Sequence, residues 1–383
     1  MRRIQLFGLG LLLALGALAI SMTPLWADLV RTIALAPTVD LPSVATPNPA
    51  TPVDGQPGLS ALLTGSGPSP TPTVAQPTTP APTPTPKPKP VSYLEDGTLL
   101  TAYGRAFGVA PILGRLGSYQ SFADMAADIR HFYDPVAELN DGKTVIPALH
   151  FIYALAIPCT PGDDCLLYLE GTVDDVEKDY IQPAAARGWQ VILDTQLGRS
   201  DPVTQVKRMI AKGYLNYDHV HVAIDPEFSS VPGEDIPGIP IGTIDASEVN
   251  AVQELLDEHV RRLGLRHKKI LIVHQFGDAN VDDGVPFMIR NKKNLRTYEN
   301  VDLVIDADGF GTPDSKVSKY NRITDHEVYP FIRFRGIKIF PFNPHEEAGH
   351  LDKPLMTFRQ IFGLDPTPGG LRMRYKPDVI IVA

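Results

Sequence analysis

The chain has 383 residues, 43% of them hydrophobic and 21% charged, which suffices for one large globular domain or two smaller ones. A formal net charge of −9 excludes the basic surplus typical of nucleic-acid-binding proteins, so we expect no nucleic acid partner. The negative charge by itself indicates only solubility.

Residues 1–27 predict a signal peptide or a membrane anchor. Two arginines directly after Met1 precede an apolar run over residues 4–20, which is the order of an export signal. Cleavage is expected after Ala19 or Ala27, and an uncut segment is just long enough to anchor the chain in a membrane. No cysteine lies near this segment, which argues against a lipid anchor. We therefore expect a secreted or cell-surface protein that meets the membrane only through this segment, and stays anchored if it is uncleaved.

Residues 28–91 predict a linker rich in proline and threonine. Sixteen of the chain's 37 prolines lie between Pro37 and Pro90. A segment of this composition cannot bury an apolar core and favours extended polyproline conformations, so it predicts a stalk. From about Val91 the composition becomes globular, which places the folded domain at residues 92–383.

The two cysteines, Cys159 and Cys165, lie in one short segment that also contains proline and glycine. They are too few for a zinc site of four thiolates, and their spacing is wider than that of a zinc-finger pair. In an exported chain we expect a disulfide between them that closes a loop. The alternative is a pair of free thiols.

Eight apolar segments predict β-strands, with helical patterns between most of them. Most are runs of valine, isoleucine and leucine without strict alternation, as expected of strands buried on both faces. Their number, and a length of roughly 290 residues, predict an α/β fold with a (β/α)8 TIM-barrel-like domain. A doubly wound open sheet is the alternative, but the chain lacks a glycine-rich phosphate loop. The predicted strands are Leu99–Phe107, Val145–Leu155, Gln190–Leu197, His219–Phe228, Lys269–Phe276, Asp302–Gly309, Gly336–Phe342 and Asp378–Ala383.

The clearest helix is predicted over residues 245–265. It begins at a capping box formed by Asp245 and Glu248, and a second capping box is predicted at Thr172. Apolar residues at spacings of three and four predict one buried face. These residues are Val249, Val252, Leu256, Val260 and Leu263.

Polar residues stand where the predicted strands end. In a parallel barrel these ends meet at one face, where barrel enzymes place their active sites. Carboxyl groups end three of the strands, and burying like charges together is costly unless function or a cation requires it. The predicted catalytic residues are Glu227, Asp225, Asp194 and Asp306. The predicted substrate-binding residues are Tyr103, Arg105, His150, Gln196, Arg199, His274, Gln275, Asp308 and Phe310.

Several of these residues have a structural alternative. Asp194 or Asp306 could cap the loop after its strand, and His274 could be a hydrogen-bonded core histidine. Asp225 could instead form a buried ion pair with Arg199. A lysine inside the seventh predicted strand, residue 338, could likewise pair with a neighbouring carboxylate. The occurrence of carboxyl groups at corresponding points of three strands favours a functional role.

The strand ends resemble a group of bacterial secreted proteins and lipoproteins with no established activity. The resemblance spans residues 98–383 and implies a TIM-barrel-like domain in an exported protein. The chain departs from that group in lacking the lipobox cysteine, which implies an ordinary or uncleaved signal. The segments that carry the resemblance are Leu193–Arg199, Ile224–Phe228, Gly242–Asn250, Val273–Phe276 and Asp306–Gly311.

The segment Ile224–Glu227 is also similar to the Asp-x-Glu end of the fourth strand in family 18 glycoside hydrolases. In that family the glutamate is the general acid and the aspartate positions a substrate amide, which implies these roles for Glu227 and Asp225. The upstream aspartates of the family's longer motif are absent, because Val222 and Ala223 stand nearby instead. The similarity is therefore an analogy between sites.

The first functional hypothesis is a glycoside hydrolase that acts on an extracellular or cell-wall glycan. Glu227 would be the acid, and Asp194, Asp225 or Asp306 its partner carboxylate. Tyr103 and Phe310 would stack on a sugar ring. The seventh predicted strand offers no glutamate, which counts against the usual pairing of strands four and seven. Under this hypothesis we expect a monomer without a cofactor, whose partner is the glycan.

Two other hypotheses remain open. A metal-dependent hydrolase such as a phosphodiesterase would hold a divalent cation with Asp194, Asp225, Asp306 and His274. It would bind phosphate with Arg105 or Arg199. A non-catalytic surface module would keep the barrel only to bind carbohydrate or for structure. A divalent cation is expected only under the phosphodiesterase hypothesis.

Overall fold

The structure, a computed structural model, describes residues 88–109, 114–233, 236–277, 288–341 and 351–383. The predicted signal segment, and the predicted linker up to residue 87, lie outside the described residues. No helix among the described residues is both long and apolar enough to cross a membrane.

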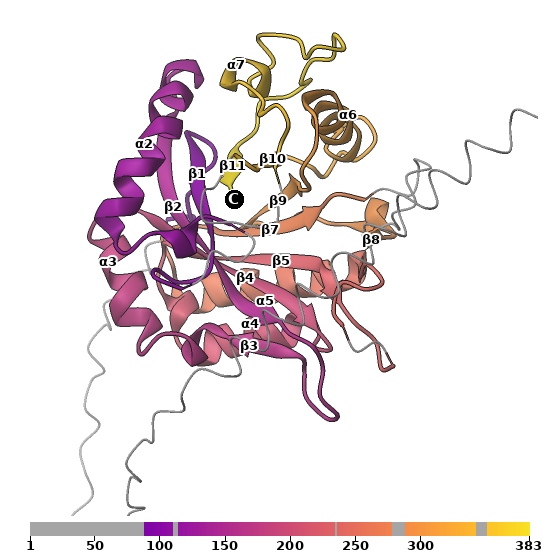
Figure 1. Cartoon of the computed structure of the whole chain (residues 1–383). Helices are drawn as coiled ribbons and strands as arrows, with labels where there is room; N and C mark the ends of the chain where they lie inside the picture. The colour runs from indigo at the N-terminus through magenta and orange to yellow at the C-terminus, as the bar shows by residue number, and fades with distance from the viewer. Residues whose placement is uncertain (1–87, 110–113, 234–235, 278–287, 342–350) are drawn as a thin grey trace, which may run out of the picture. The chain divides into compact units, whose positions relative to one another are not determined.

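Eight parallel strands close into a barrel, with helices packed on its outside (Figure 1). The order around the ring is β1, β11, β10, β9, β7, β5, β4 and β2, and β2 pairs with β1 to close it. Closure confirms the predicted α/β barrel and excludes the open doubly wound sheet. All eight predicted strands are present. They are β1 (Gly97–Gly104), β2 (Thr144–Ala156), β4 (Gln190–Gly198), β5 (Val220–Ser229), β7 (Lys269–Gln275), β9 (Val301–Ala307), β10 (Phe334–Ile339) and β11 (Val379–Val382).

Both faces of these strands are buried, one against the helices and one in the barrel interior. In β5, Val222 and Ile224 belong to the main apolar cluster that the strands form with the helices. Successive side chains of a strand point to opposite faces, so His221, Ala223 and Asp225 face the barrel axis. Because neither face meets solvent, apolar residues can occupy both, which explains the runs without strict alternation.

The helices lie between the strands along the chain. The first, α2, buries Phe122, Met125, Ile129 and Phe132 against the strands, as its spacing predicts. Short 3-10 turns occur at Leu116–Ser118, Leu169–Gly171, Tyr214–Asn216 and Lys292–Asn294, and a π turn at Glu177–Ile181. The α-helices are α2 (Phe122–Leu139), α3 (Gln182–Ala185), α4 (Pro202–Ala211), α5 (Ala246–Leu263), α6 (Pro313–Ile323) and α7 (Phe358–Ile361).

The helix caps confirm one prediction and correct another. Asp245 caps α5 in a complete capping box with Glu248. The capping box predicted at Thr172 is wrong, because Thr172 ends a 3-10 turn and the following helical segment begins after Val176 without a side-chain cap. Leu263, the last residue of the predicted buried face of α5, is 39% exposed.

A short antiparallel hairpin extends β2. Strand β3 (Leu166–Tyr168) pairs with the end of β2, with Leu155 opposite Leu167. The loop between the two strands is closed by a disulfide between Cys159 and Cys165, whose Cα atoms lie 4.6 Å apart. The predicted disulfide is therefore confirmed.

Two further contacts tie the loops and the start of the domain to the barrel. Strands β6 (Ile244–Asp245) and β8 (Ile289–Arg290) pair and connect the loops that follow β5 and β7. At the start of the described chain, Val91 N donates to Arg266 O at 2.9 Å, and Lys268 N donates to Val91 O at 3.0 Å. The last residues of the predicted linker thus contact the folded domain.

Candidate active site

The carboxyl ends of the strands bring polar side chains into one layer of the barrel interior. Tyr103 of β1 lies beside His150 of β2 in the sheet register, and His274 of β7 lies beside Asp306 of β9. Because the strands are parallel and in register, inward positions near their ends fall at similar depth. The layer contains Tyr103, His150, Asp194, Asp225, His274, Asp306 and Lys338, with Glu227 and Asp308 two residues further along their chains. All of them are buried except Glu227, which is partly exposed.

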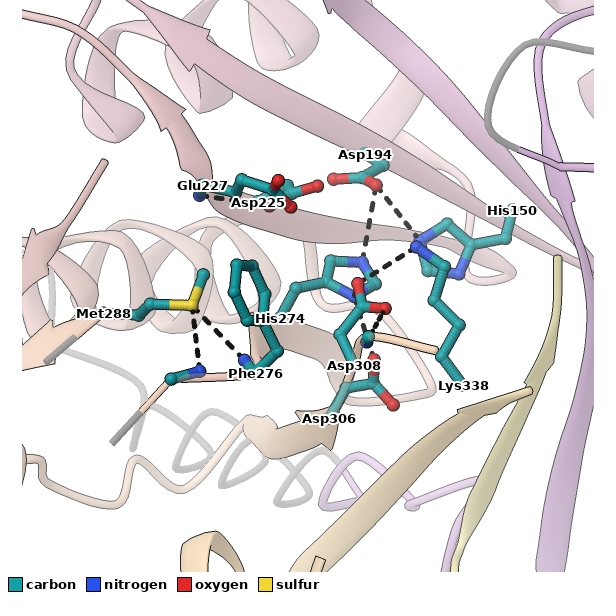
Figure 2. A network of polar contacts seen from close by, with 12 residues as sticks. His150, Asp194, Asp225, Glu227, His274, Phe276, Met288, Asp306, Asp308 and Lys338 are labelled. Atoms are coloured by element: carbon teal, nitrogen blue, oxygen red, sulfur yellow. Dashed lines mark hydrogen bonds and ion pairs between the residues drawn. The ribbon is translucent and has the colours of Figure 1, made fainter. Parts of the chain in front are cut away.

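His274 lies at the centre of this layer (Figure 2). Its Nδ1 lies 2.9 Å from Asp306 Oδ2 and 3.3 Å from Asp308 Oδ2. Its Nε2 lies 3.4 Å from Asp194 Oδ2, and His150 Nε2 approaches the same oxygen at 3.7 Å. His274 therefore has carboxylates on both sides, and one oxygen of Asp194 faces two imidazole rings.

Lys338 of β10 supplies a second cation. Its Nζ lies 3.0 Å from Asp308 Oδ2 and 3.7 Å from the centre of the Tyr103 ring. This contact agrees with the structural alternative in which Lys338 pairs with a neighbouring carboxylate. A buried pair of this kind mainly offsets the desolvation of its two charges.

These cations keep two of the carboxyl groups ionised. Burial alone would raise the pKa of Asp194, but His274 and His150 bring it below its usual range. Burial would likewise raise the pKa of Asp308, but Lys338 and His274 lower it. Burial disfavours protonation of His274, yet Asp194 and the other carboxylates raise its pKa well above the ordinary value. His274 is therefore protonated beside ionised carboxylates at neutral pH.

The two carboxyl groups on β5 behave in the opposite way. Burial raises the pKa of Asp225 to about 7, with Asp194 and Asp308 adding to the effect. Burial, together with the charges of Asp225 and Asp308, raises the pKa of Glu227 to about 8. Residues two apart on a strand face the same side, so both carboxyl groups point toward the interior end of the barrel. They can hold or exchange a proton near neutral pH.

The loop after β5 holds the backbone of Glu227. Gly242 N donates a hydrogen bond to Glu227 O at 2.7 Å. A Cβ atom on Gly242 would lie 2.4 Å from Ser229 O and 2.5 Å from Pro226 O, so a side chain cannot be placed there. Glycine at this position allows the loop to pack directly on the strand end and hold the backbone of Glu227.

Three of the predicted substrate-binding side chains bind the protein itself. The Arg105 guanidinium donates to Ile152 O and to the Thr172 hydroxyl, and burial lowers its pKa to about 10. Gln196 Oε1 accepts from a backbone amide of β2 at 2.9 Å. Gln275 accepts from a buried lysine at 2.6 Å and donates to a backbone carbonyl at 2.9 Å. These contacts connect neighbouring segments of the barrel.

The remaining predicted binding residues differ in exposure. Phe310 is 49% exposed and lies edge-on to Phe340, with 6.0 Å between the ring centres. Tyr103 is 1% exposed, which leaves its ring no room to stack on a sugar. Arg199 N donates to Asp164 O at 2.9 Å, which places Arg199 beside the disulfide-closed hairpin loop.

Two residues that shape this face carry no signal in the sequence. Lys316 of α6 donates to Lys338 O at 2.6 Å and to Gly309 O at 2.9 Å, and lies 3.3 Å from Asp352 Oδ1. Asp352 in turn accepts from the amides of Gly311 and Phe340, both at 2.9 Å. Together they join the segments that follow β9 and β10. From the sequence alone, a lysine on a helix is expected to be exposed to solvent. Only the packing of α6 shows this role.

The layer also contains two sets of side chains with the spacing of a cation site. One set is His150, Asp194 and His274, and the other is His274, Asp306 and Asp308. In each set the possible ligand atoms lie within 4.8 Å of one another. The arrangement can therefore transfer protons at Glu227 and Asp225, and has the side chains to hold a cation beneath them.

Comparison with protein-family models finds no family that matches this chain, and comparison with curated proteins finds no relative. Function therefore depends on the geometry of the strand ends. A barrel of this kind supports many unrelated reactions, so the fold alone assigns none of them.

Proposed function

We propose that this protein is a glycoside hydrolase that acts on an extracellular or cell-wall glycan, with Glu227 as its general acid. The observation that carries the proposal is the position of Glu227, a partly exposed carboxyl group near the end of β5, two residues from the buried Asp225. Burial and the charges of Asp225 and Asp308 raise its pKa to about 8. A general acid must keep its proton near neutral pH. A carboxyl group does so where burial and neighbouring negative charges disfavour its ionised form.

Asp225 is the favoured partner of Glu227. Asp194 and Asp306 are completely buried, and each already lies beside His274. Asp225 lies two residues before Glu227 on the same side of β5, and its pKa is about 7. In family 18 glycoside hydrolases the corresponding aspartate positions a substrate amide, so this pair favours a glycan that carries N-acetyl groups.

Other features fit the proposal. Phe310, which is 49% exposed, is an aromatic side chain of the kind that stacks on sugar rings. The disulfide between Cys159 and Cys165 supports an oxidising, extracellular location. In this proposal the enzyme is a monomer, and its acid–base step uses no cofactor. The phosphodiesterase hypothesis is less well supported, because the guanidinium of Arg105 is already bound within the protein.

The substitution Glu227→Gln tests the assignment. We expect the parent protein to release reducing ends from at least one glycan in a panel of cell-wall and N-acetylated polysaccharides. Glu227→Gln should lower kcat by about 10²–10⁴-fold, the usual contribution of a general acid, while glycan binding is preserved. The matched control is Glu254→Gln, which changes an exposed glutamate on α5 and should leave kcat unaltered.

The pH dependence gives a second readout. In the parent, kcat/KM should fall above about pH 8, as Glu227 loses its proton. Asp225→Asn removes a neighbouring negative charge and should move this limit to lower pH. A parent that binds glycans but hydrolyses none would point to a non-catalytic surface module, and an active Glu227→Gln variant would reject Glu227 as the acid.

A further inference from the structure

We propose that His150, Asp194 and His274 form a binding site for one divalent transition-metal ion of the zinc class inside the barrel. The three side chains come from β2, β4 and β7 and turn toward one another in the interior layer (Figure 2). This site does not depend on the proposed glycan hydrolysis, because metal binding can be measured without any substrate.

The distances between the three side chains fit a shared metal ion better than direct hydrogen bonds. Asp194 Oδ2 lies 3.4 Å from His274 Nε2 and 3.7 Å from His150 Nε2. A charged hydrogen bond between imidazole and carboxylate would be about 2.7–2.9 Å long. Two ligands bound tetrahedrally at about 2.0–2.1 Å from zinc are instead separated by about 3.3 Å. One possible ligand atom from each of the three residues lies within 4.8 Å of the other two.

The three side chains carry buried polar atoms that have no hydrogen-bond partner within the described parts of the chain. They are both ring nitrogens of His150, Nε2 of His274 and both carboxylate oxygens of Asp194. Each of the three residues has a relative exposure of 0%. Buried polar atoms are nearly always paired, so a group of unpaired ones that face each other indicates a missing ligand.

His274 has a carboxylate neighbour, Asp306, of the kind that a metal-bound histidine needs. Its other nitrogen, Nδ1, lies 2.9 Å from Asp306 Oδ2. A histidine that binds metal through one nitrogen generally donates the other N–H to a carboxylate, which fixes the ring and its tautomer. Gly336 makes room for this carboxylate, because a Cβ atom there would lie 2.7 Å from Asp306 Oδ1.

The charge of the pocket also favours a divalent cation. A divalent ion would take the place of the proton on His274, because a histidine that binds metal must be neutral. The buried carboxylates of Asp194, Asp306 and Asp308 outnumber the ammonium of Lys338, and a cation compensates this excess of negative charge.

The ligand set selects the class of metal. Imidazole nitrogens suit zinc, iron, copper and nickel, whereas calcium and magnesium prefer sites made of oxygen. Two histidines and one carboxylate are also the protein ligands of many catalytic zinc sites, which keep a further position open.

Metal titration of the full chain tests the proposal. Protein stripped of metal with a chelator is titrated with Zn²⁺ alone by calorimetry, and with Co²⁺ alone by visible absorption. We expect one ion per chain, and a Co²⁺ spectrum of low coordination number with nitrogen and oxygen ligands. His150→Gln and Asp194→Asn should each weaken Zn²⁺ binding by at least ~100-fold, and Asp306→Asn by about 10–100-fold.

The control is His221→Gln, which removes an equally buried histidine at the other end of β5, where it contacts Gln190. Its Zn²⁺ affinity should equal that of the parent. Cooperative thermal melting establishes that each variant is folded, and Asp194→Asn, which keeps the side-chain shape, decides the result if His150→Gln does not fold. A parent that binds no stoichiometric ion, or binding that persists in the folded Asp194→Asn variant, would overturn the proposal.

Discussion

At the scale of single residues, the carboxyl groups of this layer have pKa values that are shifted in opposite directions. Asp194 and Asp308 each lie beside a cation, and their pKa values are lowered. Asp225 and Glu227 lie at the end of β5, where burial and like charges dominate, and their pKa values are raised. Such a separation of pKa values is the condition for assigning acid and base roles in one site.

Glu227→Gln should stabilise the fold at alkaline pH, whatever the enzymatic activity. The charged groups that act on Glu227 are Asp225, Asp308, Lys338 and His274, and its pKa in the folded state is about 8. A carboxyl group with a raised pKa stabilises the fold below its unfolded pKa, and this contribution is lost as pH rises through about 8. Glutamine does not ionise, so the variant should gain about 2–4 kcal/mol over the parent between pH 5 and pH 9. Urea unfolding at both pH values measures this gain, and a constant difference between the two proteins would contradict it.

At the scale of secondary-structure elements, the β2–β3 hairpin is the part least supported by the barrel. β3 has three residues and pairs only with the end of β2. Cys165 is fully buried at the base of this hairpin, and Ile157 N donates to Cys165 O at 2.9 Å. The disulfide therefore holds a short segment that its own backbone pairing stabilises weakly.

Replacing both cysteines by alanine should lower the stability without changing the fold. A disulfide that closes a loop this short restricts the unfolded chain by about 2 kcal/mol. We expect the double variant to unfold at a lower urea concentration, with the circular dichroism spectrum of the parent. Thiol titration of the denatured parent is the control and should find no free thiol. Two free thiols in the secreted protein, or a variant as stable as the parent, would show that the bridge contributes nothing.

At the scale of the whole molecule, closure of the barrel pairs the first strand of the folded domain with the last one. β1 pairs with both β2 and β11, with Leu99 opposite Val379 and Ala102 opposite Val382. The ring therefore has no free edge among these strands, and no part of it is complete until the last strand is in place.

Truncation should locate the start of this domain at residue 87 rather than 92. Removing residues 1–86 should leave the melting temperature unchanged. Removing residues 1–91 also deletes the two backbone hydrogen bonds of Val91, which should cost about 1–3 kcal/mol, while the exposed Lys89–Glu299 ion pair adds little. Thermal melting of the full chain and both fragments decides between the two boundaries. Equal melting temperatures for both fragments would show that residues 87–91 do not stabilise the domain.

Much of the fold could be predicted from the sequence. The eight strands are recognisable because each is buried on both faces and most contain a continuous apolar run, such as residues 270–273 and 303–305. The acidic residues of β4, β5 and β9 are recognisable because each directly follows an apolar run, and burying like charges together is costly without a role. The predicted disulfide likewise depends on two cysteines only six residues apart.

Only the tertiary structure decided which polar residues meet and which are used elsewhere. Arg105 and Gln196 stand at strand ends as Asp225 does, yet they bind backbone carbonyls and amides of neighbouring segments. His150 and His274 are 124 positions apart in the sequence, and only the closed ring brings them to the same aspartate. The direction and depth of a side chain depend on strand register and closure, which are properties of contacts between distant segments. Local sequence patterns therefore predict the elements, whereas the site arises from their assembly.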